Sequence, residues 1–254
     1  MANHPATALI TGASSRIGAA IATDLASNGW SVVLHAHRSL DKVRDLENRI
    51  LGAGGTASVI CADLTDPDQL SDVLARASAP FGVPDLVVNN ASIFETDGIG
   101  DLDGDRFDRH FAIHVKAPCV LADSLAATLP ADRKGLIVNM IDQRVWKLTP
   151  QYLSYTLSKA AMWAATQTLA QALAPRIRVN AIGPGPSFRN ERQTEDDFRR
   201  QTQAVLLRHG PDPAEFGRTV RFLWDAASMT GQMIALDGGQ HLAWETADVV
   251  GVGE

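Results

Sequence analysis

The stretch ALITGASSRIG, residues 8–18, decides the fold. Its apolar start is typical of a strand, which runs through Thr11 and Gly12 into a helix that begins near Arg16. Gly12 and Gly18 permit a tight turn and a close backbone approach to a ligand, and the free N–H groups of the helix start suit a diphosphate. The spacing alone is common. Arg16 stands where a third glycine is often found, and its cation can face the diphosphate, an adjacent polar substrate or the protein surface.

Short β-rich runs alternate with helical patterns along the chain, and most of the runs are almost wholly apolar, as in strands covered on both faces. Repeated β-α-β spacing predicts an α/β protein: a single-domain Rossmann fold over residues 1–254, whose doubly wound parallel sheet has about seven strands with helices on both faces. Pro67 suits a first helical turn capped by Asp66, and Pro175 ends a long helix. The expected strands are 7–11, 31–36, 56–61, 85–90, 135–140, 177–182 and 232–236, and the expected helices are 16–28, 40–52, 67–78, 103–128, 150–174 and 194–208.

One long polar interruption, which begins GPGPSFRNERQTEDDFRR, spans about residues 183–208. It follows the carboxyl end of a predicted strand, where ligands bind in such sheets, so it is either a substrate loop or an ordinary solvated loop.

Composition narrows the function classes. The chain has 254 residues and a net charge of −6, which argues against a general nucleic-acid or membrane-surface binder. Cys61 and Cys119 lie apart in apolar runs, so buried thiols are favoured over a disulfide or a metal site. Without an apolar leader or a span-length apolar run, the cytoplasm is the expected compartment.

The end of the second predicted strand, HAHRS, indicates the cofactor. NAD-binding sheets place an acidic side chain near this point to bond the ribose 2′-hydroxyl. This sequence has His37, Arg38 and Ser39 instead, and a guanidinium with a hydroxyl suits a 2′-phosphate, so we expect NADP.

Tyr155 and Lys159 stand four residues apart in a predicted helix, which places them on one face. A lysine cation beside the phenol is expected to lower the tyrosine pKa, which would make it a proton donor for carbonyl or imine reduction.

The whole chain resembles the short-chain dehydrogenase/reductase family. The resemblance lies in TGASSRIG (11–18), ADL (62–64), NNAS (89–92), YTLSK (155–159), GPGPS (183–187) and DGG (237–239). It implies that Tyr155 is the acid, that Lys159 binds the ribose and tunes Tyr155, and that the assembly is a homotetramer. The cofactor-binding residues it implies, together with those argued above, are Gly12, Ser14, Arg16, Ile17, Gly18, His37, Arg38, Ser39, Asp63, Leu64, Asn90, Ala91, Lys159, Pro184, Gly185 and Ser187.

Two positions depart from the general family pattern. Asp142 stands thirteen residues before the tyrosine, where the family usually has a serine, and His114 stands where it often has an asparagine. An ionised aspartate cannot donate a hydrogen bond to a substrate oxygen, but it can hold an N–H-bearing substrate or relay a proton. For His114, a catalytic relay and a buried structural histidine are equally open.

These departures resemble the branch of pteridine reductases and dihydromonapterin or dihydrofolate reductases. The matching residues are Arg16, His37-Arg38-Ser39, Asp142 and Phe94. The resemblance implies an NADPH-dependent oxidoreductase that transfers hydride to a pterin-like ring. Its catalytic residues would be Tyr155, Lys159, Asp142 and His114, and its substrate-binding residues Arg16, Ser92, Phe94, Asp142 and Tyr155.

Two alternatives stay open: a reductase of another carbonyl, such as a 3-oxoacyl group, in which Asp142 replaces the serine by drift, and a non-enzymatic nucleotide-sensing protein on the same fold. Phe94 can also be a packed loop aromatic, and Asp142 a capping residue.

Overall fold

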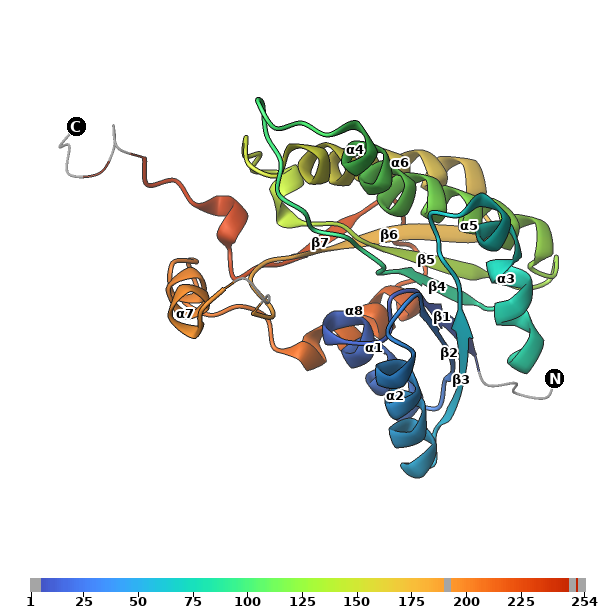
Figure 1. The fold of residues 1–254 in the computed structure, drawn as a ribbon. Helices are drawn as coiled ribbons and strands as arrows, with labels where there is room; N and C mark the ends of the chain where they lie inside the picture. Colours follow the sequence, from blue (N-terminus) through green and yellow to red (C-terminus); the bar gives the residue numbers. More distant parts are fainter. Residues whose placement is uncertain (1–5, 190–192, 247–249, 251–254) are drawn as a thin grey trace.

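The fold is a parallel sheet covered by helices on both faces (Figure 1). The structure is a computed structural model that describes residues 6–189, 193–246 and 250. Seven strands pair in the order β3-β2-β1-β4-β5-β6-β7, and every pairing is parallel. The strands are β1 (Thr7–Ile10), β2 (Ser31–Ala36), β3 (Thr56–Cys61), β4 (Leu86–Asn89), β5 (Gly135–Met140), β6 (Ile177–Pro184) and β7 (Met233–Leu236).

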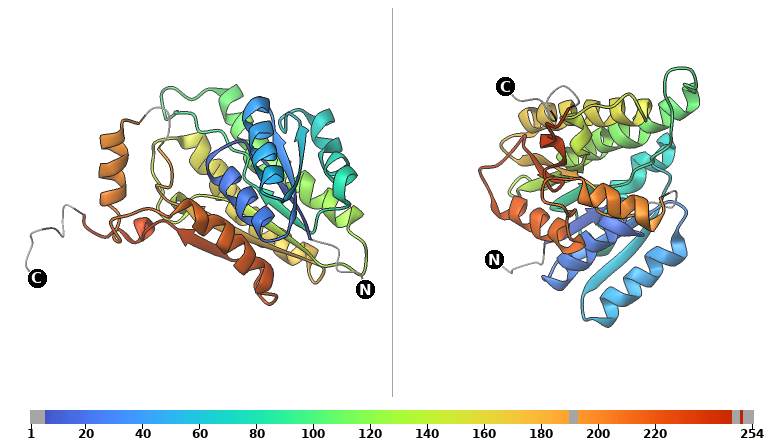
Figure 2. Two further views of the ribbon diagram at one scale, coloured as in Figure 1. Left: turned by 90° about the horizontal axis from the view of Figure 1, so that it is seen from below. Right: turned by 90° about the vertical axis from the view of Figure 1, so that its left-hand side faces the viewer.

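The helices form two layers, and the fold prediction is confirmed. On one face lie α1 (Arg16–Ser27), α2 (Leu40–Gly52) and α8 (Pro213–Asp225); on the other lie α3 (Pro67–Phe81), α4 (Gly104–Phe111), α5 (Ala117–Thr128) and α6 (Leu153–Leu173) (Figures 1 and 2). α7 (Glu195–Gln203) projects from the body beyond the end of β6. Short turns η1 (Ala112–Lys116), η2 (Gln143–Val145) and η3 (Gln240–Leu242) complete the chain.

Two large core clusters fill the layers on opposite faces of the sheet, one around Ile10, Leu34 and Phe216 and the other around Leu9 and Val87. A smaller third cluster contains Met162 and Met233. Because β1, β2, β4 and β5 are buried on both faces, their sequences are almost wholly apolar. Among the described residues, none of the helices is both long and apolar enough to cross a membrane.

The order of the strands creates the site. From β1 the chain builds outward to β3 and then returns to place β4 on the other side of β1. After β1 the chain continues to α1 on one face of the sheet, and after β4 it continues to α4 on the other face. The carboxyl edge between β1 and β4 is the point where such sheets bind ligands.

Local predictions are partly confirmed. Pro67 opens α3, and the Asp66 side chain accepts from the backbone N–H groups of Asp68 and Gln69. The helix expected over 103–128 is confirmed in its extent, since helical backbone runs from Gly104 to Thr128. Its middle, however, is a π-helical turn, η1, which divides it into α4 and α5.

The sequence analysis did not predict α8. Its central Gly217 weakens a helical pattern, but that glycine lets α8 pack closely on α1, because a Cβ there would lie 2.2 Å from the Asp24 Cβ. Arg221 then reaches across to the same carboxylate, with 2.7 Å between Nε and Oδ2.

We expect Gly217→Ala to lower the free energy of unfolding by roughly 1–3 kcal/mol, although alanine favours helices, because the added methyl group has no space. Urea unfolding measures the change. Gly104→Ala is the matched control, since nothing lies within 4 Å of a Cβ at that helix start. Equal effects of the two substitutions would contradict the close packing of α1 and α8.

Candidate functional site

The loop after β1 packs directly against the loop after β4. Gly12 has φ +64°, and a Cβ there would lie 2.8 Å from the Ala91 Cα. At Gly18 a Cβ would lie 2.5 Å from the Asn90 Nδ2. Both glycines are therefore required by contacts within the protein, before any ligand is considered.

Asn90 fastens the two loops together. Its Nδ2 donates to Thr11 O at 2.9 Å and to Gly12 O at 3.0 Å. The Thr11 hydroxyl oxygen accepts from the backbone N–H groups of Asn90 and Ala91 at 2.9 and 3.0 Å. These bonds hold the loop start rigidly beside the first turn of α1.

Arg16, the first residue of α1, is exposed and has φ +51°. This left-handed conformation is the one that glycine adopts without strain, and for other residues it costs on the order of 1 kcal/mol. The chain thus holds an arginine at a position whose backbone favours glycine. Its positive charge also acts on Tyr155, whose phenol pKa it lowers slightly against larger opposing effects.

His35, which the sequence analysis missed, supports the same loop from β2. Its Nδ1 lies 3.3 Å from Gly12 N and its Nε2 lies 3.0 Å from Ala62 O. The first partner only donates and the second only accepts, so the ring is neutral with its proton on Nε2. Burial, with the charge of His37 as a smaller cause, lowers the His35 pKa to about 4. The period-2 pattern of HAHRS, which points His35 inward, was the available signal.

At the ends of β2 and β3, His37, Arg38 and Ser39 are exposed, with the His37 Nε2 3.5 Å from the Asp63 Oδ2. Asp63 Oδ1 accepts from the N–H and the hydroxyl of Thr65 at 2.9 and 2.7 Å. These bonds orient the carboxylate at the rim of the edge.

Tyr155 and Asp142 are joined directly. The Tyr155 hydroxyl donates to Asp142 Oδ2 at 2.8 Å, while Asp142 Oδ1 accepts from Arg144 N at 2.9 Å. The capping role considered for Asp142 and its contact with the tyrosine therefore coexist, one on each oxygen.

The expected lowering of the Tyr155 pKa is wrong for the protein alone. Burial first, and the Asp142 carboxylate second, raise the phenol pKa well above its usual value. Lys159 donates to Met140 O at 2.8 Å, its Nζ lies 5.6 Å from the Tyr155 ring centroid, and burial lowers its pKa to about 8. The phenol is thus held neutral, with its proton on the Asp142 side.

His114 lies in the π turn η1, between two serines. Its Nε2 is 2.8 Å from Ser92 Oγ and its Nδ1 is 2.8 Å from Ser158 Oγ. Its ring centroid lies 5.4 Å from that of Tyr155. Burial, followed by the nearby Lys159 charge, lowers the His114 pKa well below its usual value, so the ring is neutral.

Two aromatic rings and one guanidinium form a wall beside Tyr155. Phe94 stacks on Tyr152 at 4.4 Å and meets the Tyr155 ring edge-on at 4.7 Å. The Arg144 guanidinium lies over both Phe94 and Tyr152, at 5.3 and 5.1 Å. Tyr152, which has φ +57° at the N-cap of α6, was not expected in this cluster.

Pro184 ends β6, and the following loop packs tightly against the turn after β7. A Cβ at Gly185 would lie 2.6 Å from the Asp237 Cα. The Ser187 hydroxyl donates to Gly185 O at 2.9 Å, so it stabilises its own loop.

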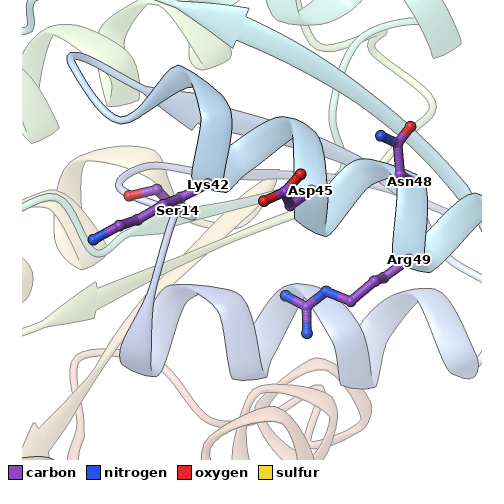
Figure 3. Close-up of a pocket in the computed structure, with 5 residues that line it drawn as sticks. All are labelled: Ser14, Lys42, Asp45, Asn48 and Arg49. Atoms are coloured by element: carbon purple, nitrogen blue, oxygen red, sulfur yellow. The ribbon is translucent and has the colours of Figure 1, made fainter.

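A surface pocket of about 550 Å³ lies between the loop after β1 and α2 (Figure 3). It is lined by Ser14, Lys42, Asp45, Asn48 and Arg49, and Tyr155 is not among its lining residues. It is a polar hollow next to the loop and not the chemical centre.

The predicted residues thus fall into two groups at one edge of the sheet. Tyr155, Lys159, Asp142, His114, Ser92 and Phe94 form one cluster. The loops after β1, β2, β3, β4 and β6 carry the rest, of which Leu64 and Ile17 pack into the two core clusters. The first group contains a buried, neutral phenol, a group that can serve as a proton donor.

Comparison with known proteins gives a consistent result. Residues 12–241 match the family described as enoyl-(acyl carrier protein) reductase. The alternative dihydrofolate reductase 1 FolM of Brucella suis, solved with NADP, is 55% identical with a TM-score of 0.94, over 98% of this chain and 99% of that one. FolM of Brucella canis, also with NADP, is 55% identical with a TM-score of 0.95, over 97% and 98%. The 3-oxoacyl-[acyl-carrier-protein] reductase FabG of Staphylococcus epidermidis is 30% identical, over 92% and 98%.

The depressed pKa of His35 predicts a pH-dependent stability. Below pH 6.5 the His35 ring becomes protonated in the unfolded state, whereas in the folded state it stays neutral down to about pH 4. Because of His35, we expect the free energy of unfolding to fall by about 1.4 kcal/mol for each pH unit as the pH is lowered across this window. His35→Asn keeps an acceptor for Gly12 N without titrating, so urea unfolding from pH 7 to 4 should show a flatter profile. An unchanged slope would contradict the buried neutral ring.

Arg16 predicts a separation of stability from binding. Arg16→Gly removes the backbone strain and should leave the unfolding midpoint unchanged or raise it by a few degrees. Arg16→Ala keeps the strain and loses only the guanidinium. Both variants should bind dinucleotide more weakly in a fluorescence titration, by roughly tenfold for one charge-assisted contact. Full affinity in both would remove Arg16 from the site.

Proposed function

Because this chain belongs to the short-chain dehydrogenase/reductase family, we propose that it is an NADPH-dependent reductase of a pterin-like ring, of the dihydropterin or dihydrofolate type. The observation that carries the proposal is the hydrogen bond between Tyr155 and Asp142 in place of a tyrosine–serine pair.

The edge of the sheet fits NADP. The rigid glycine loop and the first turn of α1 offer backbone N–H groups to a diphosphate. Arg38 and Ser39, exposed at the end of β2, would hold the 2′-phosphate. Asn89, at the end of β4, has a buried Oδ1 without a partner among the described residues, as expected where a ligand completes the bonding.

The substrate would lie against Tyr155. A pterin presents a flat ring with amino and N–H groups along one edge. Because these groups donate hydrogen bonds, carboxylate and hydroxyl acceptors on the protein suit them better than further donors would. Asp142 supplies the carboxylate, Ser92 an exposed hydroxyl, Arg16 a cation for an oxo group and Phe94 an aromatic surface.

Reduction of a ring C=N bond needs hydride at carbon and a proton at nitrogen. NADPH supplies the hydride and leaves as NADP⁺. Tyr155 donates the proton from its hydroxyl, which Asp142 Oδ2 keeps in place until transfer. The Lys159 ammonium would stabilise the resulting phenolate, since its Nζ lies 5.6 Å from the ring centroid. Asp142 would then take up a proton from solvent and pass it to the phenolate, which restores the phenol. The raised pKa of Tyr155 keeps the proton available at neutral pH.

The Brucella FolM proteins support this assignment, since their names specify dihydrofolate reduction and both were solved with NADP. We also propose that the segment 183–208 is the substrate loop; residues 190–192 of it lie outside the described residues. A cytoplasmic homotetramer completes the proposal by family likeness.

Reduction of a 3-oxoacyl group is the second candidate, favoured by the likeness to FabG. In that case Asp142 would be dispensable for chemistry. A non-enzymatic nucleotide sensor is the third, and it would tolerate Tyr155→Phe without loss of its role.

The test measures NADPH oxidation with dihydrobiopterin, dihydromonapterin, dihydrofolate and a short 3-oxoacyl thioester. The reaction is monitored as the loss of absorbance of the reduced nicotinamide. We expect turnover with at least one of the three ring substrates, and at least a 100-fold loss of kcat in Tyr155→Phe and Asp142→Ser. Asp132→Asn is the matched aspartate control and should keep full activity, because Asp132 is exposed in the loop that enters β5, at the opposite edge of the sheet.

Two results would contradict the proposal. Turnover of the thioester alone, retained or raised in Asp142→Ser, would assign carbonyl reduction of the FabG type. Absence of NADPH oxidation with every substrate would favour a nucleotide-binding role without this chemistry.

A further inference from the structure

The contacts around His114 determine where its ring proton lies. The Ser158 hydroxyl lies 2.8 Å from the backbone carbonyl of Tyr155 and 2.8 Å from the His114 Nδ1. A carbonyl oxygen can only accept, so the single Ser158 proton points to Tyr155 O. Ser158 Oγ must then accept from His114, which places the ring proton on Nδ1.

The other ring nitrogen is therefore an acceptor. His114 is 2% exposed and neutral, since burial and the Lys159 charge both oppose a second proton. Its bare Nε2 faces Ser92 Oγ at 2.8 Å, so the Ser92 hydroxyl donates to it. The alternative acceptor for that proton, Ile93 O, is farther away, at 3.2 Å.

Ser92 consequently shows only lone pairs to the exterior. It is exposed at the start of the loop after β4, next to Phe94, and its one proton is directed inward. An oxygen in this state binds an N–H or O–H group and repels a carbonyl oxygen.

We propose that Tyr155 O, Ser158 and His114 together hold Ser92 as a hydrogen-bond acceptor, so that the reducible ligand must present an N–H donor to it. The ligand part rests on the proposed function. His114 and Ser158 are positioning residues that act through Ser92, and the specificity is for rings with an amino edge over their oxo analogues.

The tautomer is tested first, without any substrate. In protein labelled with ¹⁵N-histidine, the nitrogen shifts separate Nδ1–H from Nε2–H rings, and His114→Gln assigns the signal among the seven histidines. We expect His114 as the Nδ1–H form in the wild type and a shift toward Nε2–H in Ser158→Ala. An Nε2–H ring in the wild type would overturn the proposal.

Specificity is tested with a dihydropterin and the matching dihydrolumazine, in which an oxo group replaces the 2-amino group. We expect the wild type to prefer the amino compound by at least about tenfold in kcat/KM. In Ser92→Ala the preference should be reduced, because the acceptor is lost. In Ser158→Ala it should fall to the same reduced level, mainly through a higher KM for the amino compound. Ser78→Ala, which removes a hydroxyl bonded to Leu74 O in α3, controls for loss of a serine and should keep the preference.

The outcomes separate the two proposals. A preference that survives Ser158→Ala overturns the ligand part even if the tautomer is as expected. No turnover of either compound overturns the proposed function and the ligand part with it, while the nitrogen shifts still decide the state of Ser92.

Discussion

The contact between the first and fourth strand ends is the constraint on which the site depends. Gly12 and Gly18 have no space for a side chain because Ala91 and Asn90 fill it, and the Asn90 amide bonds the two carbonyls that open the loop. This contact forms between β1 and β4, where the strand order reverses. It therefore fixes the start of α1 relative to the loop that carries Ser92 and Phe94. The glycine loop and the residues of the cluster around Tyr155 that follow β4 are thereby fixed by one rigid contact.

Burial also sets the charge states of the titratable groups in and around the site. Burial opposes every charged form, and it holds Tyr155, His35 and His114 neutral. It also lowers the Lys159 pKa to about 8, which still leaves the ammonium charged at neutral pH. The one carboxylate in contact with the phenol, Asp142, keeps the proton on the tyrosine and does not compete for it. Inside the cluster the charges are those of Asp142 and Lys159, while Arg16, Arg38 and Asp63 carry further charges at the rim.

The sequence predicted the sheet and indicated the candidate site residues because both depend on local signals. Apolar runs, glycine spacing and the tyrosine–lysine pair each carry their meaning within a few residues. What escaped depends on packing between distant segments. Gly217 conceals α8 until α1 is placed against it; the π turn is invisible in a continuous helical pattern; and Tyr152 joins Phe94 only when the loops are folded. The Tyr155 pKa was misjudged because the adjacent lysine was visible in the sequence and the burial was not.

The π turn at Ala112–Lys116 amounts to one extra residue in an otherwise regular rod. Removing that residue would restore ordinary helical bonding, but each residue of helix turns the chain by about 100°, so α4 and α5 would lose their relative rotation. His114 would then leave Ser92 and Ser158, or α5 would present a polar face to the core. Over this one turn the backbone hydrogen bonding is weaker than in an α-helix. The extra residue lets two consecutive helical segments contact different neighbours: the cluster around Tyr155 on one side and a hydrophobic layer on the other.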